Sequence, residues 1–298
     1  MKLILRVLMF LLMLCLLMVL LPSGAPISAA YAEQALAPLP LDDAPCPVPS
    51  PAAYLADGKG YQDASLSITV EALRKYDTTI LVARIKIADP SQLRTAMAAK
   101  FGTSRDMPAA RLAKRYNAVF AINGDYFNFD NKGYIVRQGT AYRDNPREGG
   151  DVLLIDNKGD LNIVRDATSE SIAAFGGTVV NSFSFGPALV VEGQAMPITE
   201  NLLVASDKPT QRMVIGQDGP LSYLCVATEG PENPGSVGLT LAQTAELMQS
   251  LGCQTAYNLD GGSSSTMVLG NEKINALSSH KVRAICDILY FATPVQPE

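Results

Sequence analysis

Alternating apolar and polar residues in two neighbouring segments constrain the fold of this chain most strongly. Residues 65–73 read SLSITVEAL and residues 78–88 read TTILVARIKIA, and both are rich in β-branched residues. A period of two places every second side chain on the same face, which is typical of half-buried strands. Residues 152–164 and 212–228 repeat the pattern on both sides of the turn sequences DNKGD and QDG. The sequence therefore predicts two further strand pairs.

Two helical patterns each lead directly into a strand. Residues 107–117 and 239–253 carry apolar side chains at helical spacing, and Thr240 is a suitable N-cap for the second helix. Strands are predicted directly after them, at 118–122 and 255–259, and each strand ends in a polar cluster. We therefore predict an α/β domain of the α+β-like kind, with a few helices packed on one mixed sheet that presents both clusters at its strand ends.

The first 53 residues predict an export signal and a linker. Lys2 and Arg6 precede an apolar run that ends in small residues, the order found in secretory signals. Residues 1–32 are interpreted as a signal peptide, or as an N-terminal membrane anchor if they are not cleaved. Residues 33–53 contain six prolines and predict a stiff, extended spacer. Residues 54–298 suit one domain, which we expect to be secreted or anchored outside the cytoplasm.

Charge balance and the single histidine argue against several classes of function. The chain has 24 Lys and Arg residues against 29 Asp and Glu residues, and an acidic surface is a poor partner for nucleic acid. His280 is the only histidine and lies in a polar run, so neither a Ser-His-Asp hydrolase nor a zinc site of several histidines is expected. Buried free thiols are expected at the four cysteines beyond the leader, with disulfide pairing left open: Cys46, Cys225, Cys253 and Cys286.

The first polar cluster, AINGDYFNF, joins an amide and a carboxylate to flat aromatic rings. Asn123 and Asp125 end an apolar run, and Tyr126, Phe127 and Phe129 follow. These groups suit a sugar, which offers apolar ring faces and hydroxyl edges. The alternative is an ordinary Asn-Gly-Asp turn with the aromatic side chains in the core.

The second polar cluster, NLDGGSS, places a carboxylate beside glycines and hydroxyls. Asp260 comes where the strand stops, and Gly261 and Gly262 let backbone amides approach a ligand without a Cβ in the way. Together with Ser263 and Ser264, the segment resembles a nest for a phosphate oxygen, although a polar turn has the same composition.

Two other segments are candidates for the same site. Arg212 stands immediately before a strand, where a guanidinium either pairs with a phosphate or carboxylate or is solvated at the strand edge. Gly186 and Pro187 lie between two apolar runs.

Five segments in chain order resemble the phosphodiester glycosidase family: AINGDYF, FGPALVVEG, QRMVIGQDGPLSYLCVAT, GLTLAQTAELMQSLGCQTAYNLDGGSSSTMV and RAICDILYF. The resemblance covers about residues 118–291. It implies a hydrolase that cleaves the bond between the anomeric carbon of a sugar and a phosphodiester oxygen. The motif residues of the family fall on Asn123, Gly124, Phe127, Gly186, Pro187, Arg212, Gly216, Asn258, Asp260, Gly261, Gly262, Ser264 and Arg283. Many relatives have glycine where this chain has Asp125.

The resulting hypothesis is an extracytoplasmic hydrolase of sugar-1-phosphodiesters in an envelope polymer or exopolysaccharide. Asp260 and Asp125 are the candidate catalytic carboxylates, with Asp260 acting as base or nucleophile at the anomeric carbon. Because phosphate is already a good leaving group, one carboxylate with cationic and N–H donors could suffice. The candidate substrate-binding residues are Asn123, Gly186, Asn258, Arg212, Gly261, Gly262, Ser263, Ser264 and Arg283.

Two alternative functions stay open. The domain could be a non-catalytic carbohydrate-binding module of the envelope. It could also be a calcium-dependent glycan hydrolase, with Asp125, Asp130 and Asp260 as oxygen ligands. Apart from this calcium alternative, no metal site or cofactor is predicted, and the partner is a carbohydrate or glycosyl phosphate, with membrane contact only through an uncleaved N-terminal segment. The sugar, its aglycone, the stereochemical course and the oligomeric state stay open.

Overall fold

The computed structural model describes residues 36–198, 206–276 and 283–296. Ala37–Glu298 form one compact unit, to which the following description applies. The predicted signal peptide or anchor at 1–32 lies outside the described residues, as does His280. Within the described part of the chain, no helix combines the length and the apolar character needed to cross a membrane.

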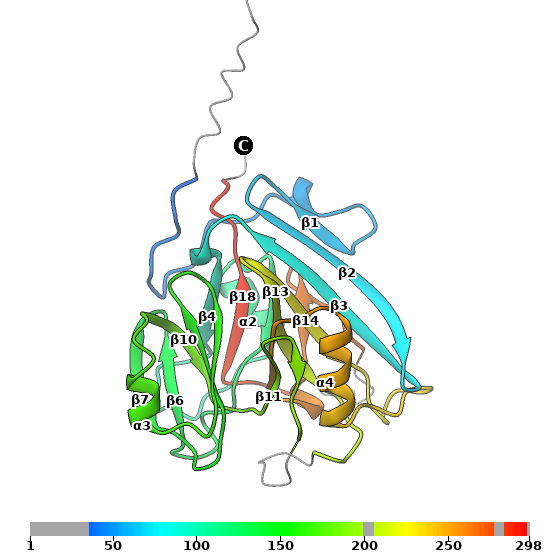
Figure 1. Cartoon of the computed structure of the whole chain (residues 1–298). Coiled ribbons are helices and arrows are strands. Elements are labelled where there is room, and N and C mark those ends of the chain that lie inside the picture. The colour runs from blue at the N-terminus through cyan, green and yellow to red at the C-terminus, as the bar shows by residue number, and fades with distance from the viewer. Residues whose placement is uncertain (1–35, 199–205, 277–282, 297–298) are drawn as a thin grey trace, which may run out of the picture. The chain divides into compact units, whose positions relative to one another are not determined.

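The larger sheet has eight strands and contains the two alternating segments (Figure 1). The strand order is β1 (Gly60–Gln62), β2 (Leu66–Lys75), β3 (Thr78–Ile87), β14 (Ser222–Thr228), β13 (Met213–Gly219), β15 (Thr255–Leu259), β11 (Ala188–Val191) and β12 (Gln194–Ala195). The turn between β13 and β14 falls at Pro220 and Leu221, later than the predicted QDG turn. Gln217 stays in the strand because its side chain is buried and accepts a hydrogen bond from the N–H of Leu161.

A five-stranded sheet faces the larger sheet. Its order is β17 (Glu272–Lys273), β16 (Met267–Leu269), β5 (Phe120–Asn123), β18 (Asp287–Phe291) and β4 (Leu93–Met97). One buried cluster joins Ile68, Ile85 and Tyr223 of the larger sheet to Phe120 and Phe291 of the smaller one. The main core therefore lies between the two sheets.

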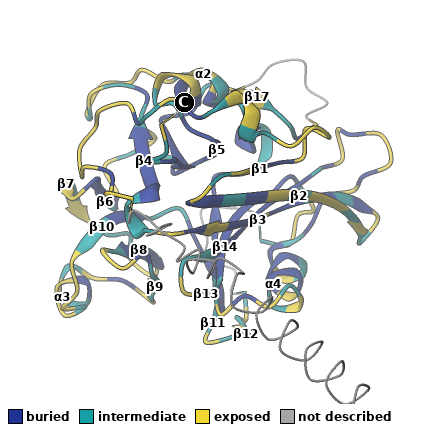
Figure 2. Ribbon diagram, turned by 90° about the horizontal axis from the view of Figure 1, so that it is seen from above, coloured by how far each residue is buried: buried dark blue, intermediate teal, exposed yellow. Residues whose placement is uncertain are grey.

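Each predicted helix covers the outer face of one sheet (Figure 2). α4 (Leu241–Ser250) packs Ala245 and Met248 against Val214 of the larger sheet, and the Thr240 hydroxyl accepts a hydrogen bond from the first turn as a capping box. α2 (Ala109–Arg115) packs its apolar side against the five-stranded sheet. These helices bury opposite faces of the two sheets from solvent.

Two smaller sheets complete the unit. The predicted pair at 152–164 forms β8 (Val152–Asp156) and β9 (Leu161–Val164), with β10 (Val179–Phe183) on the other side of β8. β6 (Gly133–Arg137) pairs with β7 (Thr140–Asn145). The short helices are η1 (Pro51–Ala53), η2 (Pro90–Gln92), α3 (Ser169–Ala173) and η3 (Gly262–Ser264). The strand-rich, α+β-like prediction with few helices is confirmed, and the strands described here pair antiparallel.

The proline-rich segment packs against the domain from Ala37 onward, which corrects the prediction of a separate spacer. Leu39 is buried in the cluster beneath α2. The guanidinium of Arg94 donates hydrogen bonds of 2.8 Å to the carbonyls of Pro40 and Asp42. Because proline has no backbone N–H, a proline-rich segment has few donors of its own. The buried guanidinium of Arg94 supplies donors to two of its carbonyls instead.

Candidate functional site

The two predicted polar clusters meet, although β5 and β15 belong to different sheets. The Nδ2 of Asn123 donates to the main-chain oxygen of Asp260 at 2.6 Å, and its Oδ1 accepts from the N–H of Thr266 at 3.0 Å. The N–H of Asp260 donates to the carbonyl of Gly124 at 3.3 Å. The prediction that a single sheet carries both clusters is wrong, because the contact runs between strand ends of two facing sheets. Asn123 acts as a clamp between them.

A pocket of about 190 Å³ lies beside Asp260. It is lined by Phe185, Lys208, Thr210, Arg212, Asn258, Leu259, Asp260, Gly261 and Gly262. The structure thus brings together Asp260, Arg212 and Asn258, three of the residues singled out from the sequence. Asn258 lies near the end of β15, Asp260 follows the last residue of that strand, and both residues line the pocket.

Asp260 is buried, with only 7% of the residue exposed. Burial raises its pKa from 3.8 to about 6, and the negative charge of Asp125 adds to this rise. The Ser264 hydroxyl and the Arg283 guanidinium oppose it. The Ser264 oxygen lacks a hydrogen-bond partner of ordinary geometry among the described residues, so we regard its effect on Asp260 as that of a nearby dipole.

The glycine-rich turn is closed on the carbonyls of the protein itself. The N–H of Gly262 donates to Gln211 at 2.9 Å, and the N–H of Ser264 donates to Gly261 at 3.1 Å. A Cβ at position 261 would lie 2.9 Å from the Gln211 oxygen, so glycine permits this approach. Ser263 lies in the middle of the η3 turn. The predicted phosphate nest therefore lacks two of the N–H donors expected for it.

Arg212 forms part of the pocket wall and is tied to main-chain carbonyls. Its Nε donates to Leu239 at 3.0 Å and its Nη2 donates to Lys208 at 2.9 Å. Burial lowers its pKa from 12.5 to about 10, so the guanidinium stays charged at neutral pH. Its charge acts on the pocket, while two of its donor groups bind the protein. The exposed Lys208 lines the same pocket.

Arg283 is an exposed cation close enough to Asp260 to lower the pKa of that carboxyl. Its Nη2 donates to the Tyr126 hydroxyl at 2.8 Å, and the guanidinium lies 5.0 Å from the centre of the Tyr126 ring. The Tyr126 ring stacks on Phe129 with ring centres 5.0 Å apart, and Phe129 is 62% exposed. Phe127 is buried instead. The aromatic residues of the first cluster are therefore divided between core and surface.

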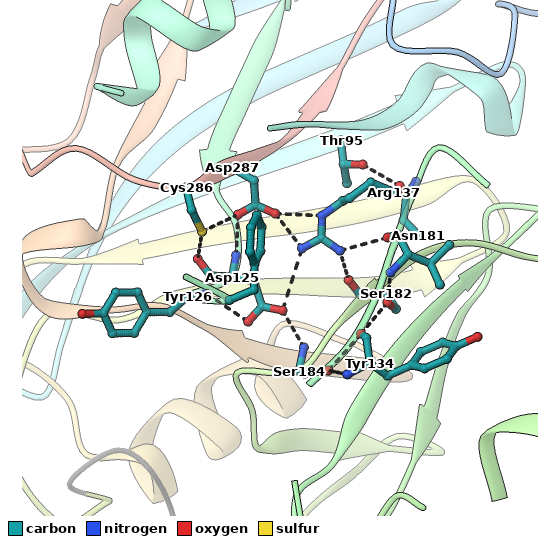
Figure 3. A network of polar contacts seen from close by, with 12 residues as sticks. Thr95, Asp125, Tyr126, Tyr134, Arg137, Asn181, Ser182, Ser184, Cys286 and Asp287 are labelled. Carbon is teal, nitrogen blue, oxygen red and sulfur yellow. Dashed lines mark hydrogen bonds and ion pairs between the residues drawn. The ribbon is translucent and has the colours of Figure 1, made fainter. Parts of the chain in front are cut away.

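Asp125 is held by main-chain donors and a buried arginine (Figure 3). Its Oδ1 accepts from the N–H of Tyr126 at 3.1 Å, and its Oδ2 accepts from the N–H of Ser184 at 2.8 Å. Arg137 Nη2 lies 3.8 Å from Oδ2. Burial raises the pKa of Asp125 from 3.8 to about 6; the charge of Arg137 opposes this rise and that of Asp287 adds to it.

Sequence reasoning missed the ion pair between Arg137 and Asp287. The Nε and Nη2 of Arg137 donate to Asp287 Oδ2 at 2.8 and 2.6 Å, and both side chains are almost fully buried (Figure 3). Asp287 Oδ1 accepts from the N–H of Asp125 at 2.8 Å. A Cβ on Gly124 would lie 2.5 Å from Asp287 Oδ1, so glycine makes room for the carboxylate. In the sequence, the one sign of this pair is a single charged residue at one end of each apolar run: Arg137 ends YIVR, and Asp287 begins DILYF.

Gly186 contributes to the site through its backbone. Its carbonyl accepts a hydrogen bond of 2.7 Å from Asn258 Nδ2. Its φ of +72° is one that glycine adopts readily, and the peptide bond to Pro187 is cis. The loop before β11 thereby holds the side chain of Asn258 from one side.

Two of the three aspartates named as possible calcium ligands lie beside different arginines. Asp130 pairs with Arg147 at 2.8 Å, whereas Asp125 lies beside Arg137. Over residues 36–198, 206–276 and 283–296, no three His, Cys, Asp or Glu side chains are grouped to hold a metal ion. The four cysteines beyond the leader are buried free thiols: Cys46, Cys225, Cys253 and Cys286.

Comparison with known proteins shows the family and the fold. A curated relative, the SPbeta prophage-derived uncharacterized protein YomE of Bacillus subtilis (strain 168), is 27% identical over 201 residues. The match covers 65% of this chain but only 31% of that protein, so this chain spans less than a third of its length.

Two solved structures are similar at low sequence identity and therefore bear on the fold alone. The zebrafish N-acetylglucosamine-1-phosphodiester alpha-N-acetylglucosaminidase catalytic domain, auto-inhibited by its pro-peptide, has a TM-score of 0.63 and 19% identity, over 76% of this chain and 83% of that chain. A hypothetical protein from Synechocystis has a TM-score of 0.52 and 16% identity, over 76% and 62%. Residues 116–292, more than half of the sequence, match phosphodiester glycosidase. This chain belongs to the phosphodiester glycosidase family.

Proposed function

We propose that this chain is an extracytoplasmic hydrolase that cleaves the bond between the anomeric carbon of a sugar and a phosphodiester oxygen in an envelope polymer or exopolysaccharide. Family membership supports the reaction class, and the signal-like residues 1–32 support the location. The observation that carries the proposal is the buried carboxylate of Asp260, in a pocket that also has Lys208 in its lining and Arg283 nearby. Hydrolysis develops positive charge at the anomeric carbon and leaves negative charge on phosphate. The carboxylate of Asp260 can stabilise the positive charge, and Lys208 and Arg283 can stabilise the negative charge.

Asp260 acts at the anomeric carbon. With a pKa of about 6 it is mostly ionised at neutral pH, and its low exposure strengthens its interaction with a developing oxocarbenium ion. It serves either as the nucleophile or as the base that activates water. The configuration of the released sugar distinguishes these two roles.

Asp125 supplies the second carboxyl. Its burial and the neighbouring charge of Asp287 favour the protonated form, which can donate a proton to the departing phosphate. Asp125 and Asp260 lie on two pockets that share Phe185 as a lining residue. This shared lining residue supports the assignment of Asp125 as proton donor and Asp260 as ionised carboxylate.

A panel of sugar-1-phosphodiesters tests the proposal, with reducing sugar and phosphomonoester measured separately. Release of equal amounts of both products from a subset of the panel is the expected result. A protein that binds these compounds without releasing sugar would instead be a carbohydrate-binding module. Activity that is lost with a chelator and restored by calcium would favour the calcium-dependent hydrolase.

The dependence of activity on pH should show a maximum near pH 6. Activity rises as Asp260 ionises, and because its pKa is about 6 rather than 3.8, this rise lies well above the range of an ordinary aspartate. Activity falls again as Asp125 loses its proton, also near pH 6. The two limbs belong to a coupled pair of carboxyls. The pH profile of kcat/KM measures both limbs, and Asp125→Asn should remove the alkaline one; an unchanged alkaline limb in that variant would assign it to another group.

Replacing Arg283 should mainly weaken substrates that carry phosphate. Arg283→Met is expected to lower kcat/KM for a sugar-1-phosphodiester by about 30-fold, because an exposed guanidinium near Asp260 stabilises negative charge on phosphate. The matched control is Arg84→Met, which removes another exposed guanidinium, one paired with Glu71. Equal losses on a phosphodiester and on an uncharged aryl glycoside would show that Arg283 acts only by holding Tyr126.

A further inference from the structure

The side-chain amide of Asn258 has a hydrogen-bond partner at its nitrogen, whereas its buried oxygen has none among the described residues. Its Nδ2 donates to the carbonyl of Gly186 at 2.7 Å, and since a carbonyl can only accept, this contact assigns which end is nitrogen. Its Oδ1 has no hydrogen-bond partner in the part of the chain that the structure describes, although Asn258 is only 1% exposed. A buried acceptor without a donor is costly, so it calls for a water or a ligand.

The unpaired oxygen, Asn258 Oδ1, belongs to a residue that lines the Asp260 pocket. Asn258 and Asp260 both line this pocket. Asp260 follows the end of β15 two positions after Asn258, so their Cα atoms are at most roughly 7 Å apart. Neighbouring substituents of one sugar ring can contact both side chains at that spacing.

A comparison with Asn123, the other asparagine of the site, shows that only Asn258 has a side-chain amide oxygen without a hydrogen-bond partner among the described residues. Asn123 is equally buried, at 1% exposure, but its Nδ2 and Oδ1 both bind main-chain groups. Three hydroxyls that follow Asp260 also lack partners in the described residues: those of Ser264, Ser265 and Thr266. Unpaired polar atoms therefore occur on both sides of Asp260 in the chain, and among these residues Asn258 is the one that lines the pocket.

We propose that Asn258 Oδ1 determines sugar specificity by accepting a hydrogen bond from the substituent on C2, the ring carbon next to the anomeric carbon. This proposal rests on the proposed function. Asp260 acts at the anomeric carbon and Asn258 lines the same pocket, so we assign this acceptor to the adjacent ring carbon. Hydrogen bonds to the C2 substituent strengthen as a glycosidic bond breaks. Only a donor satisfies this oxygen. The substrate class is therefore sugars with a hydroxyl or an amide N–H at C2, and 2-deoxy sugars are discriminated against.

The test compares the preferred substrate with its 2-deoxy form. The probes are the methyl phosphodiester of whichever hexose the enzyme hydrolyses best and the same compound without the C2 substituent. Asn258→Leu removes the acceptor and should reduce the preference for the complete sugar by about tenfold. The two probes differ in intrinsic lability, but this difference cancels when the ratio of kcat/KM values is compared between wild type and variant.

Two controls separate recognition from structural support. Asn123→Leu removes an amide that binds only the protein, so it should lower both rates together and leave the ratio unchanged. Asn258→Asp keeps an acceptor oxygen at this position and should retain the ratio, even if the lost bond to Gly186 lowers both rates. Should Asn258→Leu fail to fold, Asn258→Ala removes the same acceptor. An unchanged ratio in the Leu or Ala variant would overturn the proposal.

A binding experiment distinguishes this proposal from the proposed function. The glycosyl 1-phosphate and its 2-deoxy form are titrated calorimetrically against the wild type and Asn258→Leu, without turnover. Weaker binding of the 2-deoxy compound to the wild type, by about tenfold more than to the variant, supports the role of Asn258. If the wild type binds in this way but releases no sugar, the proposed function fails alone. If it releases sugar with the same preference as the variant, the role of Asn258 fails alone.

Discussion

Asp260→Asn lowers the rate of sugar release by on the order of 10⁴-fold, the expected result for loss of a carboxylate at the reacting carbon. Asparagine has nearly the same size, and the main-chain oxygen at position 260 keeps its hydrogen bond from Asn123. The variant therefore loses charge and nucleophilicity without losing the clamp between the two sheets. The measurement is kcat for a sugar-1-phosphodiester, together with the thermal unfolding of the same sample.

The control for this prediction is Asp57→Asn, which neutralises an exposed carboxylate on the segment before β1. It should leave kcat within about twofold of the wild type, because an exposed charge away from the pocket is screened by solvent. Full activity in Asp260→Asn would remove Asp260 from the mechanism. An unfolded variant would leave the question to Asp260→Ser, which removes the same charge at smaller volume.

Asp287→Leu should lower the free energy of unfolding by about 3–5 kcal/mol, because it leaves the Arg137 guanidinium buried without its ion-pair partner. Arg137 is 1% exposed and donates two hydrogen bonds to Asp287. The N–H of Asp125 loses its acceptor in the same variant. Urea denaturation measures the stability, and a midpoint equal to that of the wild type would contradict the role of this pair.

The double variant Arg137→Met with Asp287→Leu is the matched control. It removes both charges together, so we expect it to recover much of the stability lost in the single variant. Activity should not recover, since Asp125 would remain without the groups that hold its backbone and lie beside its carboxylate. A double variant as unstable as Asp287→Leu would show that the loss comes from packing rather than from an unpaired charge.

The strands and helices were predictable because their patterns are local. β2 and β3 follow from the alternation in 66–87, and α4 follows from helical spacing with a capping threonine. The contact between the Asn123 and Asp260 segments was predicted, but the reason given for it was wrong. Strand ends were expected on one sheet, yet periodicity along the chain does not specify which sheet a strand joins.

The chemical types at the site were predictable, but their partners were not. Asn123 and Arg212 were assigned to ligand because an amide and a guanidinium suit sugar and phosphate, whereas the structure uses most of their bonds on main-chain carbonyls and N–H groups. The partner of Arg137 lies 150 residues away in sequence. A single charged residue next to an apolar run looks like a strand edge until its partner is known.

The central position of β18 in the five-stranded sheet determines when the site can first exist. β18 lies between β5 and β4, and it carries the aspartate that binds Arg137. A ribosome that has made only the first 280 residues has already produced Asp125, Arg137 and Asp260, but not this strand. The Asp287–Arg137 pair can therefore form only after translation has passed residue 287, and a product terminated before β18 would lack both this strand and the support that it gives to Asp125.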